Sequence, residues 1–195
     1  MKRITLLGIF IATIFTFLFT SCNQINKAKM EQSKGITRSS FGTAGGKEVF
    51  LYTLINSKGT EVKITNFGGI VTSWISADKN GNKSSIVLGY DSLSGYLATH
   101  PYFGAIVGRY GNRIAKGKFS IDSIEYTLAI NNGPNHLHGG VVGFDKAVWE
   151  PTVENDSVPS LLLSYLSKDG EEGYPGNLNV DVHYTLTDDD ELKIE

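Results

Sequence analysis

Two glycine-rich stretches hold the polar side chains whose types and spacing could do chemistry. The first, residues 108–117, carries Asn112 and Arg113 side by side. Both are planar groups with several donors, and arginine offers five N–H donors but cannot act as a base. Such a pair suits adjacent hydroxyls of a sugar, and it would suit a carboxylate equally well. The alternative is a structural arginine paired within its own loop.

The second stretch, residues 131–140, carries His136 and His138 two positions apart. On an extended segment the two rings would share one face. The pair could then contribute to a zinc site, but a tetrahedral site needs further ligands, and no cysteine or nearby acidic residue supplies them. The other interpretation is one functional histidine and one packing histidine. A neutral imidazole can transfer a proton or hydrogen-bond a ring oxygen. His183, in an alternating apolar segment, is expected to be structural.

Two acidic segments contain clustered carboxylates that could form a site. Asp169–Glu172 clusters three carboxylates in the segment 168–176, but adjacent acids do not set the separation that glycoside hydrolysis requires. We therefore expect residues 168–176 to form a loop of defined conformation and not a pair of catalytic carboxylates. The run 188–190 is three aspartates, which indicates a solvated turn because the glycine and distal glutamate of a calcium loop are missing.

Composition excludes several classes of protein. The chain has 18 basic and 20 acidic residues, a net charge of −2, and no basic stripe that would hold a phosphate backbone, so no nucleic-acid partner is expected. A phosphate loop, a dinucleotide-binding fingerprint and a Gly-x-Ser-x-Gly elbow are absent from the sequence. Cys22 is the one cysteine, so an intramolecular disulfide is excluded.

The first 34 residues resemble an export signal followed by a tether. Lys2 and Arg3 precede an apolar run over residues 4–19, and Ser21 stands directly before Cys22. This pattern predicts a lipoprotein signal peptide over 1–21, lipidation of Cys22 and a polar tether over 22–34. An ordinary cleaved signal or an uncleaved anchor is the alternative. We expect the lipid to hold the protein on the membrane, at the periplasmic face of the outer membrane.

The remaining residues, 35–195, predict one all-β domain. β-branched and aromatic residues alternate with polar ones between turn signals, which is typical of an antiparallel sandwich. One helical turn is expected at 91–98, capped by Asp91 or Ser92. Another alternating segment begins near residue 192, from which we expect a domain that is incomplete at its C-terminus. The predicted strands are 48–55, 60–65, 70–75, 84–88, 119–121, 124–128, 148–154, 160–167 and 178–186.

Six segments, in order, resemble the aldose 1-epimerase (galactose mutarotase) family over roughly residues 36–195. They are Asn66-Phe67-Gly68-Gly69, Gly108-Arg109, Asn112-Arg113-Ile114-Ala115-Lys116-Gly117, Leu137-His138-Gly139-Gly140, Gly143-Phe144-Asp145-Lys146 with Trp149, and Gly170-Glu171-Glu172-Gly173-Tyr174-Pro175-Gly176. The resemblance implies a galactose-mutarotase-like antiparallel β-sandwich. It also implies interconversion of the α and β anomers of free aldohexoses such as glucose and galactose, without a metal or organic cofactor.

The resemblance carries family roles to three residues. Arg113, supported by Asn112, matches the substrate-binding arginine, and His138 matches an assisting active-site histidine that contacts the sugar near its ring oxygen. The family's principal acid, a histidine in a Thr-Asn-His-x-Tyr-Phe-type motif, and its base, a glutamate, have no match here. We therefore expect the 195-residue chain to be inactive by itself. The alternative is a non-catalytic, lipid-anchored carbohydrate-binding module.

Overall fold

The computed structural model describes residues 34–98 and 101–195, and all of them belong to one compact unit, Gln32–Glu195. The predicted signal peptide, Cys22 and nearly all of the predicted tether lie outside the described residues. Within the described part of the chain, no helix is both long and apolar enough to cross a membrane.

The first sheet has five strands in sequence order, and every neighbouring pair is antiparallel. Its strands are β1 (Gly35–Ala44), β2 (Lys47–Ile55), β3 (Glu61–Thr65), β4 (Ile70–Ala77) and β5 (Lys83–Ser85). The β1–β2 hairpin turns on Gly45 and Gly46, whose φ values of 56° and 76° suit the left-handed geometry of a two-residue hairpin loop. Short local connections of this kind explain why strand order follows chain order.

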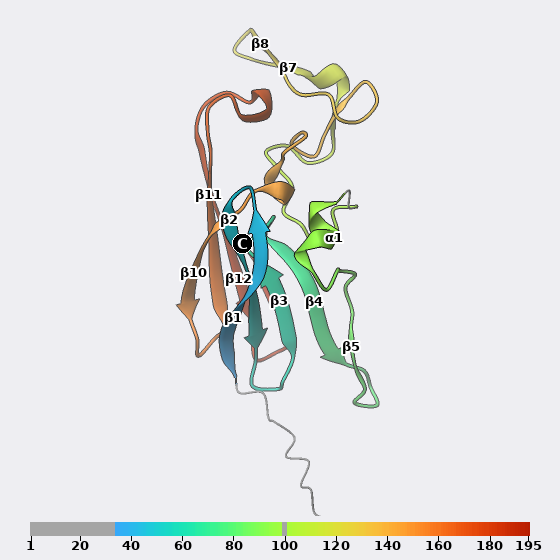
Figure 1. Ribbon diagram of the computed structural model, residues 1–195, viewed down its shortest axis with the longest axis vertical. Coiled ribbons are helices and arrows are strands. Elements are labelled where there is room, and N and C mark those ends of the chain that lie inside the picture. Colours follow the sequence, from blue (N-terminus) through green and yellow to red (C-terminus); the bar gives the residue numbers. More distant parts are fainter. Residues whose placement is uncertain (1–33, 99–100) are drawn as a thin grey trace, which may run out of the picture. The chain divides into compact units, whose positions relative to one another are not determined.

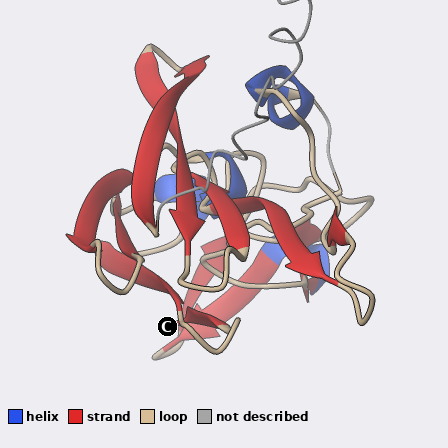
Figure 2. Cartoon of the chain, turned by 90° about the horizontal axis from the view of Figure 1, so that it is seen from below, coloured by secondary structure: helices blue, strands red, loops and turns tan. Residues whose placement is uncertain are grey.

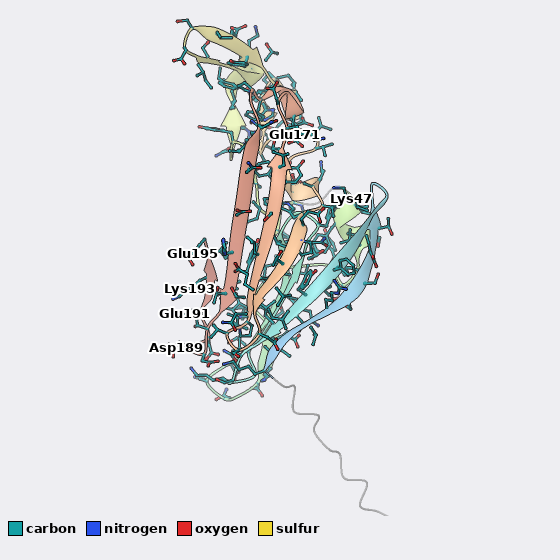
Figure 3. All side chains as sticks on the ribbon, turned by 90° about the vertical axis from the view of Figure 1, so that its left-hand side faces the viewer. Lys47, Glu171, Asp189, Glu191, Lys193 and Glu195 are labelled. Atoms are coloured by element: carbon teal, nitrogen blue, oxygen red, sulfur yellow. The ribbon has the colours of Figure 1, made fainter. Side chains whose placement is uncertain are left out.

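The second sheet has four antiparallel strands, again in sequence order. They are β10 (Glu150–Asn155), β11 (Ser160–Ser167), β12 (Leu178–Leu186) and β13 (Leu192–Ile194). β11 and β12 pair over their whole length, from Ser160 with Thr185 to Ser167 with Leu178. Figure 3 shows Glu171 near one end of this sheet, while Glu191, Lys193 and Glu195 lie around β13, toward the opposite end.

The two sheets pack face to face around one apolar core (Figure 1). Alternate side chains of β11 and β12 are buried in it, as the two-residue period of a strand requires. Trp149, just before β10, is fully buried between them, and its indole N–H donates to the carbonyl of Phe144 at 3.1 Å. The buried members are Tyr52, Leu54, Val62, Ile64, Val71, Phe144, Ala147, Trp149, Leu161, Leu163, Val182, Tyr184 and Leu186. The predicted antiparallel sandwich is confirmed.

The segment between β5 and β10 carries short elements outside both sheets. These are α1 (Leu93–Leu97), β6 (Arg113–Ile114), η1 (Ala115–Gly117), β7 (Lys118–Ile121), β8 (Ile124–Thr127), β9 (His136–Leu137) and η2 (Phe144–Lys146); η3 (Glu171–Gly173) joins β11 to β12. β7 and β8 form a hairpin beyond the ends of the sheet strands (Figure 1). Helices are few and short beside the strands and loops (Figure 2).

Most predicted strands are confirmed, and three details are corrected. β1 was missed, because its sequence is mostly polar and most of its residues are exposed. The segment predicted at 84–88 is strand only over 83–85, with Ile86 and Leu88 exposed after it. The helix lies where predicted, yet the Ser92 side chain does not cap it and instead contacts the Ser94 hydroxyl at 2.9 Å.

Candidate functional site

A two-residue ladder brings the two glycine-rich stretches together. β6 pairs with β9 in antiparallel register, with Arg113 opposite Leu137 and Ile114 opposite His136. The next positions along the ladder are Asn112 and His138, and the His138 amide donates to the Asn112 carbonyl at 3.0 Å. The predicted residues Asn112, Arg113 and His138 therefore lie together, although 26 positions separate the first from the last.

The His138 ring is bound to the backbone of Asn112. The Asn112 amide N–H donates to Nδ1 of His138 at 2.9 Å. Because Nδ1 is then the acceptor, the neutral ring carries its proton on Nε2. His138 is half-buried, and the ring of Tyr102 lies against it with 4.7 Å between centroids.

Arg113 is exposed and lies between two amide oxygens. Its Nε donates to Oδ1 of Asn132 at 2.9 Å, and its Nη1 donates to Oδ1 of Asn112 at 3.2 Å. Within the described residues these two bonds use two of the five guanidinium N–H groups, which leaves three donors for a ligand. The amides thus orient the guanidinium without neutralising its charge.

His136 has a packing role, and it does not share a face with His138. It is fully buried; its Nδ1–H donates to the Ala129 carbonyl at 2.7 Å, and its Nε2 accepts from the Tyr174 hydroxyl at 2.8 Å. The expected shared face is wrong because His138 has a φ of 51°, which turns the chain out of the extended conformation. Among the described residues, no group of three or more His, Cys, Asp or Glu side chains could hold a metal ion.

Glycine is required at two positions of the segment Leu137-His138-Gly139-Gly140. A Cβ on Gly139 would lie 1.5 Å from the Gly108 carbonyl oxygen, and one on Gly140 would lie 2.0 Å from Oε2 of Glu172. No side chain fits at these distances. Asn131 also fixes the segment, because its side-chain N–H groups donate to the carbonyls of Leu137 and Gly140 at 2.9 and 2.7 Å.

The acidic segment 168–176 forms a defined loop, as predicted. Glu172 accepts hydrogen bonds from the amides of Val141 and Val142 at 2.8 and 2.9 Å. Glu171 accepts bonds from the hydroxyls of Tyr165 and Ser167. The carboxylates of both glutamates are therefore engaged in hydrogen bonds within the fold.

Arg109 joins the same loop to the first glycine-rich stretch. Its guanidinium donates to the Ser167 hydroxyl at 2.8 Å and to the carbonyls of Ser167, Lys168, Pro175 and Gly176 at 2.9 to 3.0 Å. It also lies over the Tyr174 ring, 5.7 Å from the centroid. Burial raises the pKa of Tyr174 to about 12, so its phenol is neutral near neutral pH. Arg109 is thus bonded within the fold, whereas Arg113 is exposed and keeps donors for a ligand.

A cleft of about 460 Å³ opens beside Arg113. Tyr110, Phe119 and Tyr174 line it with aromatic surface, and Arg109 borders it. Its size falls in the range of small-molecule sites. Sequence reasoning missed Tyr102; its only signal was its place just before Gly104, at the start of the glycine-rich segment.

Comparisons with known proteins point to one family. A sequence profile described as aldose 1-epimerase matches residues 51–195. Over 155 residues the chain is 51% identical to galactose mutarotase of Bos taurus, covering 77% of this chain and 44% of that protein. It is 37% identical to aldose 1-epimerase of Escherichia coli over 149 residues, with 76% and 42% covered.

A solved structure agrees with the sequence matches. The chain resembles galactose 1-epimerase from Lactobacillus acidophilus with a TM-score of 0.73 and 28% identity, over 83% of this chain and 47% of that one. The chain therefore spans a little under half the length of the curated relatives that it matches.

Proposed function

Because the chain belongs to the aldose 1-epimerase family, we propose that its domain binds a free aldose at Asn112, Arg113 and His138 and serves the interconversion of α and β anomers. Two observations support this proposal. Relatives at 51% and 37% identity are named galactose mutarotase and aldose 1-epimerase. Asn112, Arg113 and His138 also lie close together where β6 pairs with β9.

The linkage of His138 to Asn112 and Arg113 is the observation that carries the proposal. The neutral His138 ring offers an Nε2–H donor, because Nδ1 already accepts the Asn112 amide. Arg113 adds three further N–H donors and a fixed positive charge. Sugar oxygens are acceptors at fixed spacing, so an array of oriented donors matches them.

Mutarotation needs proton transfer in both directions. A base removes the proton of the anomeric hydroxyl while an acid protonates the ring oxygen, the ring opens, and the aldehyde rotates before the reverse transfers close it. His138, with its proton on Nε2, is suited to hydrogen-bond the ring oxygen. Glu171 and Glu172 are engaged in the fold, so we expect the principal acid and base to come from groups outside this cluster.

Sugar binding is tested on the full chain, purified in detergent, by titrating glucose and galactose in a calorimeter. We expect Arg113→Met to weaken binding by about tenfold or more, since a charge-assisted hydrogen bond contributes about 1.5–3 kcal/mol. Arg38→Met is the matched control, because Arg38 lies over the Phe50 ring on β1 and β2. Equal binding by both variants, or no binding by the parent chain, would contradict the proposal.

Polarimetry of fresh α-D-glucose tests the chemistry. With only an assisting histidine in the cluster, we expect a rate equal to that of buffer. A faster rate that His138→Ala abolishes would mean that the described residues supply their own acid and base, and that our assignment of these groups to other residues is wrong.

We also propose that Cys22 carries lipid and that the protein faces the periplasm from the outer membrane. The support is the basic start, the apolar run and the position of Ser21 before Cys22. Stable anchoring takes more than one acyl chain. Cell fractionation should find the parent chain in the outer membrane and Cys22→Ala elsewhere. An unchanged distribution would rule out lipidation at this residue, and protease access from outside intact cells would rule out the periplasmic face.

A further inference from the structure

Three residues in unusual backbone conformations meet at one imidazole. Tyr102, Asn112 and His138 have φ values of 63°, 68° and 51°. Non-glycine residues seldom adopt this left-handed region, and a bulky residue there is a true outlier. Such residues gather at functional sites, where the surrounding structure holds them in place. Two of the three already belong to the proposed sugar site, and Tyr102 has no role in it so far.

The Asn112 amide alone does not fix the His138 ring. A hydrogen bond to Nδ1 sets the distance and direction of one ring edge, 2.9 Å from the amide nitrogen. The ring could still tilt about the line that joins the two nitrogens. The Tyr102 ring packs against the imidazole, with centroids 4.7 Å apart and ring planes inclined by 59°. A second ring in contact with the imidazole restricts the tilt that the hydrogen bond permits.

Tyr102 is in turn held to the first sheet. The Ala105 amide donates to the Tyr102 carbonyl at 3.2 Å, and the Gly104 carbonyl accepts from the amide of Val71, on β4, at 3.0 Å. Burial, and the nearby carboxylate of Asp145, raise the pKa of Tyr102 above its ordinary value. The ring is therefore neutral and anchored to a strand of the sandwich, which suits a support for a functional side chain.

We propose that Tyr102 is a positioning residue of the sugar site: its ring fixes the plane of the His138 imidazole, so that Nε2–H is presented in one direction. This proposal rests on the function proposed above. Tyr102 acts through His138, so its aromatic ring matters and its hydroxyl does not.

Long-range ¹H–¹⁵N spectra of the full chain in detergent, labelled at histidine, test the geometry without any need for turnover. We expect Tyr102→Leu to shift the His138 ring protons, because the neighbouring ring current is lost, and to broaden them as the imidazole tilts. Tyr102→Phe should leave them in place. Tyr90→Leu is the matched control, since Tyr90 is 40% exposed and packs edge-on against Tyr96, 5.1 Å between centroids.

Unchanged His138 signals in Tyr102→Leu would overturn the proposal. Should that variant fail to fold, nuclear Overhauser contacts between the two rings in the parent chain decide the matter. Contacts are expected, and their absence would overturn the proposal as well.

Sugar affinity supplies the functional readout. We expect Tyr102→Leu to bind aldose about tenfold more weakly, because small misplacements of a positioned group have large effects, and Tyr102→Phe to bind within about twofold of the parent. If the parent binds sugar and Tyr102→Leu binds it equally well, Tyr102 does not position the site. If the parent binds no sugar, the proposed function fails, while the spectra still report whether Tyr102 holds His138.

Discussion

Replacing Tyr174 by Phe removes one hydroxyl from the contact that ties the 129–140 segment to the 168–176 loop. The hydroxyl donates to Nε2 of His136 at 2.8 Å, and the other ring nitrogen donates to the Ala129 carbonyl. His136 is fully buried, so water cannot replace the lost donor without a rearrangement. The variant keeps the aromatic ring, which lies 6.0 Å from the ring of Phe119 and under the guanidinium of Arg109.

The expected loss of stability follows from the buried ring nitrogen that loses its hydrogen-bond donor. Nε2 of His136 becomes a buried acceptor without a partner, which costs about 1–3 kcal/mol of the free energy of unfolding. For a domain of this size, each kcal/mol lowers the midpoint of thermal unfolding by about 2–4 °C. Apolar packing changes little, because Phe fills nearly the same volume as Tyr.

Chemical denaturation followed by circular dichroism measures the effect. Tyr126→Phe is the matched control, because Tyr126 is half-buried and stacks on Phe119 at 5.4 Å in the same aromatic group. We expect the control to change the free energy of unfolding by less than about 0.5 kcal/mol. If Tyr174→Phe unfolds at the same denaturant concentration as the control, the hydroxyl does not satisfy His136 and the reasoning fails.

Two further predictions concern a glycine and a carboxylate. Gly68→Ala would place a Cβ 2.2 Å from the Asp145 carbonyl oxygen at a φ of 68°, whereas in the control Gly45→Ala the Cβ would meet no atom within 4 Å. Thermal unfolding should therefore show that Gly68→Ala lowers the free energy of unfolding by well above about 1 kcal/mol. A comparable loss in the Gly45→Ala control would contradict this. Lys34, 2.7 Å away, lowers the pKa of Asp188 from 3.8 to about 2. Because the pKa of Asp188 is lower in the folded state than in the unfolded state, its carboxylate stabilises the folded state above the unfolded pKa, and this stabilisation is lost as pH falls toward about 2. Asp188→Asn should therefore reduce the dependence of the free energy of unfolding on pH below about pH 4. A pH dependence equal to that of the parent would argue against the ion pair.

The sheets could largely be predicted, because their strands carry local patterns. β11 and β12 match their predicted ranges at both ends, since apolar residues alternate there between clear turns. β1 could not be predicted in this way. Its residues pair with β2 through the backbone while many of its side chains face outward, so its sequence lacks the apolar period that marks a strand.

The candidate site was predictable in residue type but not in arrangement. Asn112, Arg113 and His138 stand out because donors and an imidazole lie among glycines. Their meeting depends on the pairing of β6 with β9, which joins residues more than 20 positions apart, and no local pattern encodes that pairing. The different fates of His136 and His138 likewise depend on tertiary neighbours, Tyr174 for one and Tyr102 for the other.

The core and the candidate site are built by different parts of the chain, and this separation affects which substitutions can accumulate during evolution. The apolar core is built mainly by β2, β3, β4, β11 and β12, whereas Tyr102, Asn112, Arg113 and His138 all lie in the chain between β5 and β10. Substitutions at the exposed positions of that intervening segment can alter ligand preference without repacking the sandwich, whereas Phe144, Ala147 and Trp149, in the same segment, belong to the core. Gly139 and Gly140 are also constrained, because a Cβ there would collide with Gly108 and Glu172, so we expect changes in ligand preference to arise from substitutions around these glycines and not at them.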